Sequence, residues 1–313
     1  MSEASRPTPQ EFEKVLAAAS TAQASFEEEN LPLSRRIQRF LHLYPTTVPF
    51  VVLLLGLLLG CTVNYSHFVT GSNLSTVLTQ VTIIGILGIA QTLVILTAGI
   101  DLSVGVIMVI SSVVMGRLAV VDGVPVLIAF PLGLICGLFC GWLNGALVTR
   151  MQMPPFIVTL GTLSIIGALN TFYSQSETIR EQDIEEKAPF LQLMGIPFNV
   201  GSARIILASF LLIALAIVFW YVLNRTAYGR HIYATGDDPE AARLAGINTD
   251  RILLSVYVLA GFIAAIAGWA LIVGVFRSAV SLAGLDVLWQ EFAIGVLIIV
   301  AVALDQWIRR ISK

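Results

Sequence analysis

The residues of this chain that could do chemistry are few, and the most unusual of them is a carboxylate within an apolar stretch. Asp101 stands in the sequence AGIDLSVG (98–105), between two long apolar segments. Because a carboxylate is costly to place in hydrocarbon, this residue needs a structural or functional reason. It could cap a helix that starts at Leu102, or it could line a hydrophilic pathway. The sequence alone leaves both interpretations open.

Two uncharged polar residues also fall inside apolar segments. Asn144 stands in GWLNGALV and Asn170 in GALNTFY. Each could hydrogen-bond between helices, which is the usual role of such a side chain in lipid, or line a path. Together with Asp101, these two asparagines are the candidate pathway residues.

Motifs for catalysis are missing from the sequence. It contains no Walker A motif, no GxGxxG after a strand and no HExxH helix. The histidines lie in flanks or loops and the cysteines in apolar segments, where a thiol is most simply a small packing residue: His42, His67, His231, Cys61, Cys136 and Cys140. We therefore expect no catalytic residue, no cofactor and no metal site. The net charge of −2 indicates no nucleic-acid partner.

A polar island, residues 225–247, separates two apolar segments and carries the signals of a short capped helix. Asp238 is suited to the N-cap, Pro239 to the first helical position and Glu240 to the positive end of the helix dipole. Alanines follow, and Gly246 can end the helix in a left-handed conformation. The island is either a docking element or a well-formed connecting loop.

The segments that must position these residues are apolar and long. The chain of 313 residues is 57% hydrophobic and only 12% charged, a balance that suits lipid. Eight stretches are long enough to cross about 30 Å of hydrocarbon: 45–63, 74–96, 102–121, 124–147, 155–173, 203–223, 252–276 and 287–308. Pro131 lies in the fourth, so that stretch could be broken or re-entrant. The sequence predicts an all-α, polytopic transmembrane helix bundle.

The basic residues predict the orientation of this bundle. Most of the 18 Lys and Arg residues fall on one side when the N-terminus is inside, as the positive-inside rule requires. We therefore expect cytoplasmic tails at 1–44 and 309–313, a membrane domain at 45–308 and a cytoplasmic loop at 224–251. Residues 174–202 form an acidic loop on the outer side.

Three motifs together resemble the membrane permease subunits of bacterial ATP-driven monosaccharide importers: AGIDLSVG (98–105), GWLNGALVTRMQMPPFIVTLGTL (141–163) and YGRHIYATGDDPEAARLAGI (228–247). The resemblance runs from about residue 45 to the end, and the fructose type is closer than the ribose and xylose types. It implies a multi-pass protein of the bacterial inner membrane. The implied partners are membrane lipid, a cytoplasmic ATP-binding subunit, a periplasmic sugar-binding protein and a second permease, most simply another copy.

The resemblance also implies which residues couple to the ATPase. In such permeases the loop that matches 225–247 holds a coupling helix, which sits in a groove of the ATP-binding subunit. Eight positions match the family's pattern there: Gly229, Gly236, Asp238, Pro239, Glu240, Ala241, Ala242 and Gly246. ATP hydrolysis then belongs to the partner, and this chain supplies a path and a gate.

One stretch departs from the family's pattern. Family members have about ten spans and carry a polar stretch, a glycine-rich segment and a further span after the helix that matches 252–270. Here GWAL (268–271) runs directly into IVGVFRSAV (272–280), so a few dozen residues are missing near 270–273. A permease remnant that does not transport is therefore one alternative. A secondary carrier or channel is another, although its spans would normally hold more buried ionisable groups.

Overall fold

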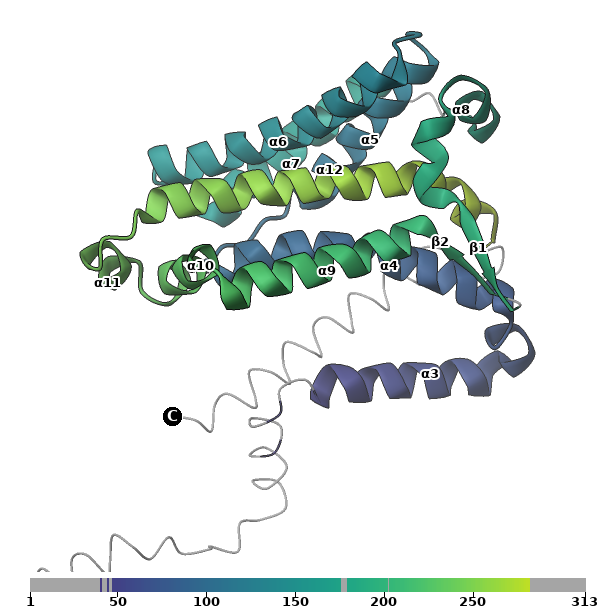
Figure 1. The fold of residues 1–313 in the computed structure, drawn as a ribbon, viewed down its shortest axis with the longest axis horizontal. Coiled ribbons are helices and arrows are strands. Elements are labelled where there is room, and N and C mark those ends of the chain that lie inside the picture. Colours follow the sequence, from purple (N-terminus) through teal and green to yellow (C-terminus); the bar gives the residue numbers. More distant parts are fainter. Residues whose placement is uncertain (1–39, 41–43, 45–46, 176–178, 202, 282–313) are drawn as a thin grey trace, which may run out of the picture. The chain divides into compact units, whose positions relative to one another are not determined.

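The computed structural model describes residues 40, 44, 47–175, 179–201 and 203–281 (Figure 1). These residues form helices and one hairpin: α3 (Thr47–Phe68), α4 (Gly71–Leu96), α5 (Val104–Val120), α6 (Val126–Arg150), α7 (Pro155–Ser174), α8 (Glu181–Lys187), the 3-10 helix η1 (Pro189–Gly195), β1 (Pro197–Val200), β2 (Ala203–Ile206), α9 (Leu207–Arg225), α10 (Ala227–Asp237), α11 (Pro239–Leu244) and α12 (Thr249–Ser281). The chain divides into two compact units, residues 1–62 with 285–313 and residues 63–284. Elements α4 to α12 belong to the second unit.

The helices agree closely with the predicted spans. Five of those described are long and apolar enough to cross a membrane, namely α4, α6, α7, α9 and the part of α12 up to Ile272, while α5 is shorter. The stretch predicted at 45–63 corresponds to α3, and the one predicted at 287–308 lies outside the described residues, as do most of 1–44 and all of 309–313. The chain is therefore a predominantly helical membrane protein.

The expectation that Pro131 could break its span is wrong. The helix α6 runs through this residue without interruption. Pro131 lies in the second turn, so the missing N–H removes a single bond, the one to the carbonyl of Leu127. Leu127 is 88% exposed and close to the start of the helix. The interruption of the helices at residues 97–103, between α4 and α5, lies where the predicted spans 74–96 and 102–121 leave a break.

The helix α12 packs against α4, α5 and α6 and carries the centre of the core (Figure 1). Its side chains Val256, Tyr257 and Ile263 are fully buried or nearly so, and they join Ile86 and Leu93 of α4 in one apolar cluster. Many apolar side chains of α7 and α9 are exposed, as lipid-facing helices require. Lipid-facing and buried surfaces are thus both apolar, and packing rather than hydrophobicity distinguishes them.

Glycines bring α6 and α12 into backbone contact. A Cβ atom at Gly141 would overlap the carbonyl oxygen of Tyr257, and one at Gly261 would overlap that of Gly137. Glycine at these positions therefore lets the two helices approach to backbone contact. Gly88 differs, because a Cβ atom there would meet no atom within 4 Å.

The connections gather at two ends of the bundle. At one end, Gly145 near the end of α6 meets Leu254 near the start of α12, and α10 lies against Leu96 at the end of α4. At the other end, Nζ of Lys187 donates to the carbonyl of Val120 at 3.2 Å. We call the first the α10 end and the second the hairpin end.

The hairpin end is more structured than the sequence suggests. Residues 174–202 were expected only as an acidic loop, but α8 and η1 lie there, and β1 pairs with β2 in antiparallel register from Pro197↔Ile206 to Val200↔Ala203. Gly201, with φ +62°, makes the turn. The backbone N–H of Arg204 donates to Oγ of Ser75 at 2.8 Å, so the hairpin is attached to the start of α4. The all-α expectation therefore holds for the described spans but not for this hairpin.

The contact between α6 and α12 gives a stability prediction. Gly261→Val should lower the free energy of unfolding by about 1–3 kcal/mol, because its side chain has to displace the backbone of α6. Thermal unfolding in detergent measures the change. Gly88→Ala, a substitution into open space, should leave the unfolding temperature unchanged or slightly higher. Equal losses in both variants would contradict the close contact as the cause.

Candidate functional site

The predicted helix after Asp238 is present as α11. Oδ1 of Asp238 accepts hydrogen bonds from the backbone N–H groups of Glu240 at 2.9 Å and Ala241 at 3.0 Å. Pro239 takes the first helical position, as expected. Gly246 has φ +87°, and its N–H donates to the carbonyl of Arg243 at 2.9 Å. The sequence thus predicted both ends of this helix correctly.

A second helix, α10, precedes α11 and was not predicted. Thr226 caps it by accepting a hydrogen bond from the N–H of Gly229 at 3.2 Å. Its buried positions, Gly229, Ile232 and Thr235, recur every three residues on one face. This spacing, with a threonine cap before it, was the available signal.

Two glycines fix α10 against the spanning helices. A Cβ atom at Gly236 would overlap the carbonyl oxygen of Leu96, and one at Gly229 would overlap that of Leu223. Position 236 of α10 therefore lies directly on the backbone at the end of α4. These two members of the predicted coupling set hold the base of the site and are not its contact surface.

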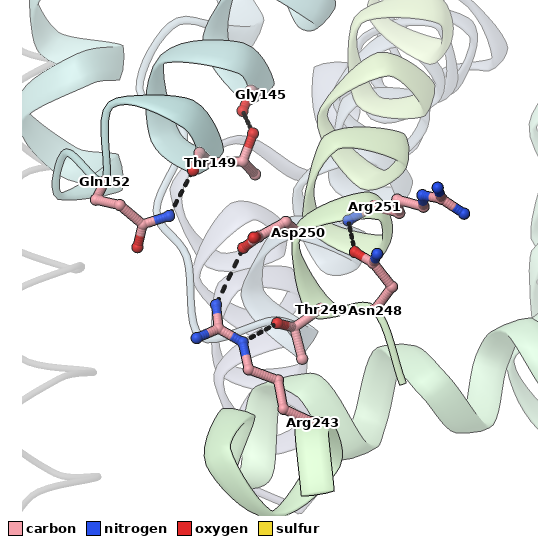
Figure 2. Close-up of polar contacts among 8 residues, drawn as sticks. All are labelled: Gly145, Thr149, Gln152, Arg243, Asn248, Thr249, Asp250 and Arg251. Carbon is pink, nitrogen blue, oxygen red and sulfur yellow. Dashed lines mark hydrogen bonds and ion pairs between the residues drawn. The ribbon is translucent and has the colours of Figure 1, made fainter. Parts of the chain in front are cut away.

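Polar contacts join α11 to the start of α12 (Figure 2). Nε of Arg243 donates to Oγ1 of Thr249 at 2.8 Å, and an Nη atom of Arg243 lies 3.1 Å from Oδ1 of Asp250. Asn248 caps α12 by accepting from the N–H of Arg251 at 3.0 Å. Both side chains of the ion pair are about half exposed, so the pair contributes little to stability. Its effect is to orient α11 relative to the start of α12.

A tyrosine attaches α10 to α12. The hydroxyls of Tyr228 and Ser255 are 2.8 Å apart, and the Ser255 hydroxyl also donates to the carbonyl of Ile252 at 2.8 Å. Since a serine hydroxyl has one hydrogen, Tyr228 is the donor in the first bond. Burial raises the pKa of the Tyr228 phenol, and the bond to Ser255 only partly offsets this shift. The phenol therefore keeps its proton at neutral pH.

The exposed surface of α11 differs in one respect from expectation. Glu240 and Ala241 are exposed, but Ala242 is only 4% exposed and packs inward. Ala242 therefore packs beneath the exposed face of α11, and its assignment to the coupling set stays a prediction. Leu244 is 91% exposed and Tyr233 of α10 is 45% exposed. Neither exposed side chain was predicted, although a leucine at the end of a helix within a polar island was a visible signal.

Asp101 lies in the interruption between α4 and α5. The helix α5 begins at Val104 and not at Leu102, so Asp101 does not cap it in the way expected. Its Oδ1 instead accepts from the backbone N–H of Ser103 at 2.8 Å and from the Ser103 hydroxyl at 2.7 Å. Asp101 is only 4% exposed, so in this state the carboxylate lines no open path.

Asn144 joins this interruption to α6. Its Nδ2 donates to Oγ of Ser103 at 2.7 Å, and the side chain is fully buried. Of the two roles left open for Asn144, this contact supports bonding between neighbouring segments, and a place on a path stays a prediction. A third helix contributes as well, because Oγ1 of Thr159 on α7 lies 3.1 Å from the carbonyl oxygen of Ile100 and 3.0 Å from that of Pro155, so its one hydrogen is shared between them.

Asn170 is not part of this cluster. It lies on α7 eleven residues beyond Thr159, roughly 16 Å along a helix with a rise of 1.5 Å per residue. Its side chain is half-buried. The structure thus brings together two of the three candidate pathway residues. Among the described residues, no group of three His, Cys, Asp or Glu side chains could hold a metal ion.

Comparison with known proteins assigns the chain to a class. Residues 73–302 match the family described as branched-chain amino acid transport system / permease component. The chain belongs to this family of transport permease components. No solved structure matches the sequence.

Individual relatives are sugar permeases by name. The fructose import permease protein FrcC of Rhizobium meliloti is 45% identical over 348 aligned positions, which cover 97% of each chain. The ribose import permease protein RbsC of Bacillus subtilis is 34% identical over 220 residues, covering 70% of this chain and 66% of that protein. The D-allose transport system permease protein AlsC of Escherichia coli is 30% identical over 203 residues, covering 64% and 60%.

The cap of α11 gives a local prediction. Asp238→Ala should destabilise α11 by about 1 kcal/mol, because two backbone N–H groups lose their acceptor. Amide hydrogen exchange at residues 240 and 241 should then be about fivefold faster. Asp237→Ala, which removes the neighbouring exposed carboxylate, is the matched control and should leave these amides unchanged. Equal acceleration by both variants would rule out the cap.

Proposed function

We propose that this chain is the transmembrane permease subunit of an ATP-driven monosaccharide importer in a bacterial inner membrane. The observation that carries the proposal is the 45% identity to a fructose import permease across 97% of both chains. Relatives named for ribose and allose are less similar, which favours fructose as the sugar. A periplasmic binding protein would deliver the sugar at the hairpin end, and a second copy of the chain would complete the path.

The surface of α11 is suited to dock the ATP-binding subunit. It presents Leu244 and Glu240 from a helix that is capped, hydrogen-bonded to α12 and joined directly to α10. An exposed leucine on a rigid base favours burial in a groove of a partner. Displacement of α11 would also displace α10, which is in backbone contact with the end of α4 at Gly236.

The orientation of the bundle follows from the basic residues. With the α10 end in the cytoplasm, positive charge gathers on the inner side, as the positive-inside rule requires. The residues of that side are Arg6, Lys14, Arg35, Arg36, Arg39, Arg150, Arg225, Arg230, Arg243, Arg251, Arg309, Arg310 and Lys313. Tails at both ends of the chain would then be cytoplasmic.

A specific observation favours a second candidate function, a remnant that docks without transporting. The alignment with FrcC has 348 positions and this chain has 313 residues, so at least 35 positions have no counterpart here. The helix α12 continues without interruption through residues 270–273 and spans 33 residues, roughly 50 Å at 1.5 Å per residue. That exceeds about 30 Å of hydrocarbon, as a fusion of two partial spans would.

A secondary carrier is less well supported. Coupling to protons or sodium ions normally requires ionisable groups within the spans. In the described spanning region Asp101 is engaged with Ser103, and Arg117 lies in the last turn of α5. The energy for transport would therefore come from the partner ATPase.

ATP hydrolysis in proteoliposomes tests the proposal. The chain is reconstituted with the ATP-binding subunit encoded beside it, with and without the sugar-loaded binding protein. Stimulation by the loaded protein together with sugar uptake is the expected result. Binding of the ATPase with neither stimulation nor uptake would instead identify the remnant.

The proposed docking surface can be tested with a double variant that changes its charge. Leu244→Asp combined with Glu240→Lys should weaken binding of the ATP-binding subunit by at least about tenfold, because exposed contact residues at the centre of an interface carry most of its affinity. Binding to purified permease in detergent is measured. Glu185→Lys on α8, exposed at the hairpin end, is the control and should bind normally. Normal binding by the double variant would exclude α11 as the docking element.

The orientation predicts which side each end can be labelled from. In a variant with the three native cysteines replaced by alanine, Leu244→Cys should react with an impermeant maleimide only in inside-out membrane vesicles. Glu185→Cys should react only in right-side-out vesicles or spheroplasts. The reverse pattern would invert the topology and remove the docking proposal.

A further inference from the structure

The interruption between α4 and α5 is in backbone contact with α10, the helix that directly precedes the docking helix α11. It begins where Leu96 ends α4, and the carbonyl of that residue lies against Gly236 of α10 with no room for a Cβ atom. Thr97 follows, buried, with Oγ1 donating to the carbonyl of Val94 at 2.8 Å. A displacement of α10 would therefore press directly on the first residues of the interruption.

The segment after this contact is held in one strained shape. Ala98 has φ +57°, a left-handed conformation that costs a non-glycine residue about 1–2 kcal/mol. A Cβ atom at Gly99 would lie 3.0 Å from the hydroxyl of Tyr257, so the backbone here packs tightly against α12. Such strain persists only where neighbouring groups impose it. The segment is therefore held rigidly and would transmit a displacement rather than deform.

A buried chain of hydrogen bonds leaves the far end of the segment. Nδ2 of Asn144 donates to Oγ of Ser103, and the Ser103 hydroxyl donates to Oδ1 of Asp101. All three side chains are at most 4% exposed. Oδ1 of Asn144 has no hydrogen-bond partner among the described residues, so the amide is held there through its Nδ2 bond alone. The bond is thus the single polar link between α6 and the interruption that the described residues show.

We propose that the hydrogen-bonded side chains of Asn144, Ser103 and Asp101 transmit a displacement of α10 and α11 to the spanning helices α5 and α6. These are positioning residues: they are buried, and through their hydrogen bonds they join the segment that touches α10 to the helices α5 and α6. The inference rests on the proposed function, and it goes further by naming the connection through which docking acts on the bundle. Interhelical bonds elsewhere hold the bundle together without lying on this route.

Stimulated ATP hydrolysis in proteoliposomes tests the inference. Asn144→Leu keeps the side-chain volume close to that of asparagine, removes the link to Ser103 and leaves the bonds between Ser103 and Asp101 in place. We expect normal basal hydrolysis and normal binding of the ATP-binding subunit, with stimulation by the loaded binding protein reduced about tenfold, a typical size of coupling between sites.

The matched control breaks an interhelical bond away from the route. The hydroxyls of Thr82 on α4 and Ser209 on α9 are 2.8 Å apart, so Thr82→Val removes a comparable bond. Its stimulation should equal that of the unaltered chain. An equal loss in Thr82→Val would mean general loosening of the bundle and would overturn the proposal.

Ser103→Ala alone covers the case in which Asn144→Leu does not insert, and its stimulation should also be about tenfold lower; full stimulation in this variant would overturn the proposal. Ser103→Ala removes the central hydroxyl, and the double variant with Asn144→Leu should be no worse than Ser103→Ala alone, because both act through one bond. Asp101→Asn keeps an oxygen that accepts both bonds from Ser103, and it should retain stimulation. Additive losses in the double variant, or loss in Asp101→Asn with full stimulation in Asn144→Leu, would overturn the proposal.

The outcomes separate this inference from the proposed function. Stimulation of the unaltered chain with full stimulation of Asn144→Leu would refute the route and leave the importer intact. An unaltered chain that binds the ATPase but shows neither stimulation nor uptake would refute the importer and the route together.

Discussion

Backbone that leaves a helix inside a bilayer must find every hydrogen-bond partner within the protein, since hydrocarbon offers none. Residues 97–103 meet this constraint mostly with partners close by in the sequence. The N–H groups of residues 97–99 donate to carbonyls in the last turn of α4, and the N–H of Ser103 donates to Asp101. The hydroxyl of Thr159 on α7 lies 3.1 Å from the carbonyl oxygen of Ile100, and Asn144 of α6 adds a side-chain bond to Ser103. The short helix α5 and the positions of α6 and α7 around it depend on this arrangement.

The spans and the ends of α11 could be predicted because their signals are local in the sequence. Span positions follow from long apolar runs, so six predicted stretches coincide with α4, α5, α6, α7, α9 and α12. The cap at Asp238 and the left-handed Gly246 are local signals, and both ends of α11 were correct. The break between α4 and α5 was also predicted, because the apolar runs 74–96 and 102–121 leave residues 97–101 outside both spans; the additional break suggested by Pro131 was wrong.

What the sequence could not show depends on tertiary contacts. Ala242 and Leu244 are both good helix formers two residues apart, and only the packing of α11 on the bundle decides that the first is buried and the second exposed. The pairing of Asn144 with Ser103 joins residues 41 positions apart and has no local signature. Periodicity assigns such residues to a segment but not to a partner.

An exposed leucine at the tip of α11 also ties assembly to temperature. Burial of apolar surface lowers the heat capacity and is driven near room temperature by the release of water, so such a contact weakens on cooling. Leu244, at 91% exposure, has nearly its whole side chain to bury. A complex held through this residue would be most loosely joined in the cold, where the lipid around the spanning helices is also stiffest.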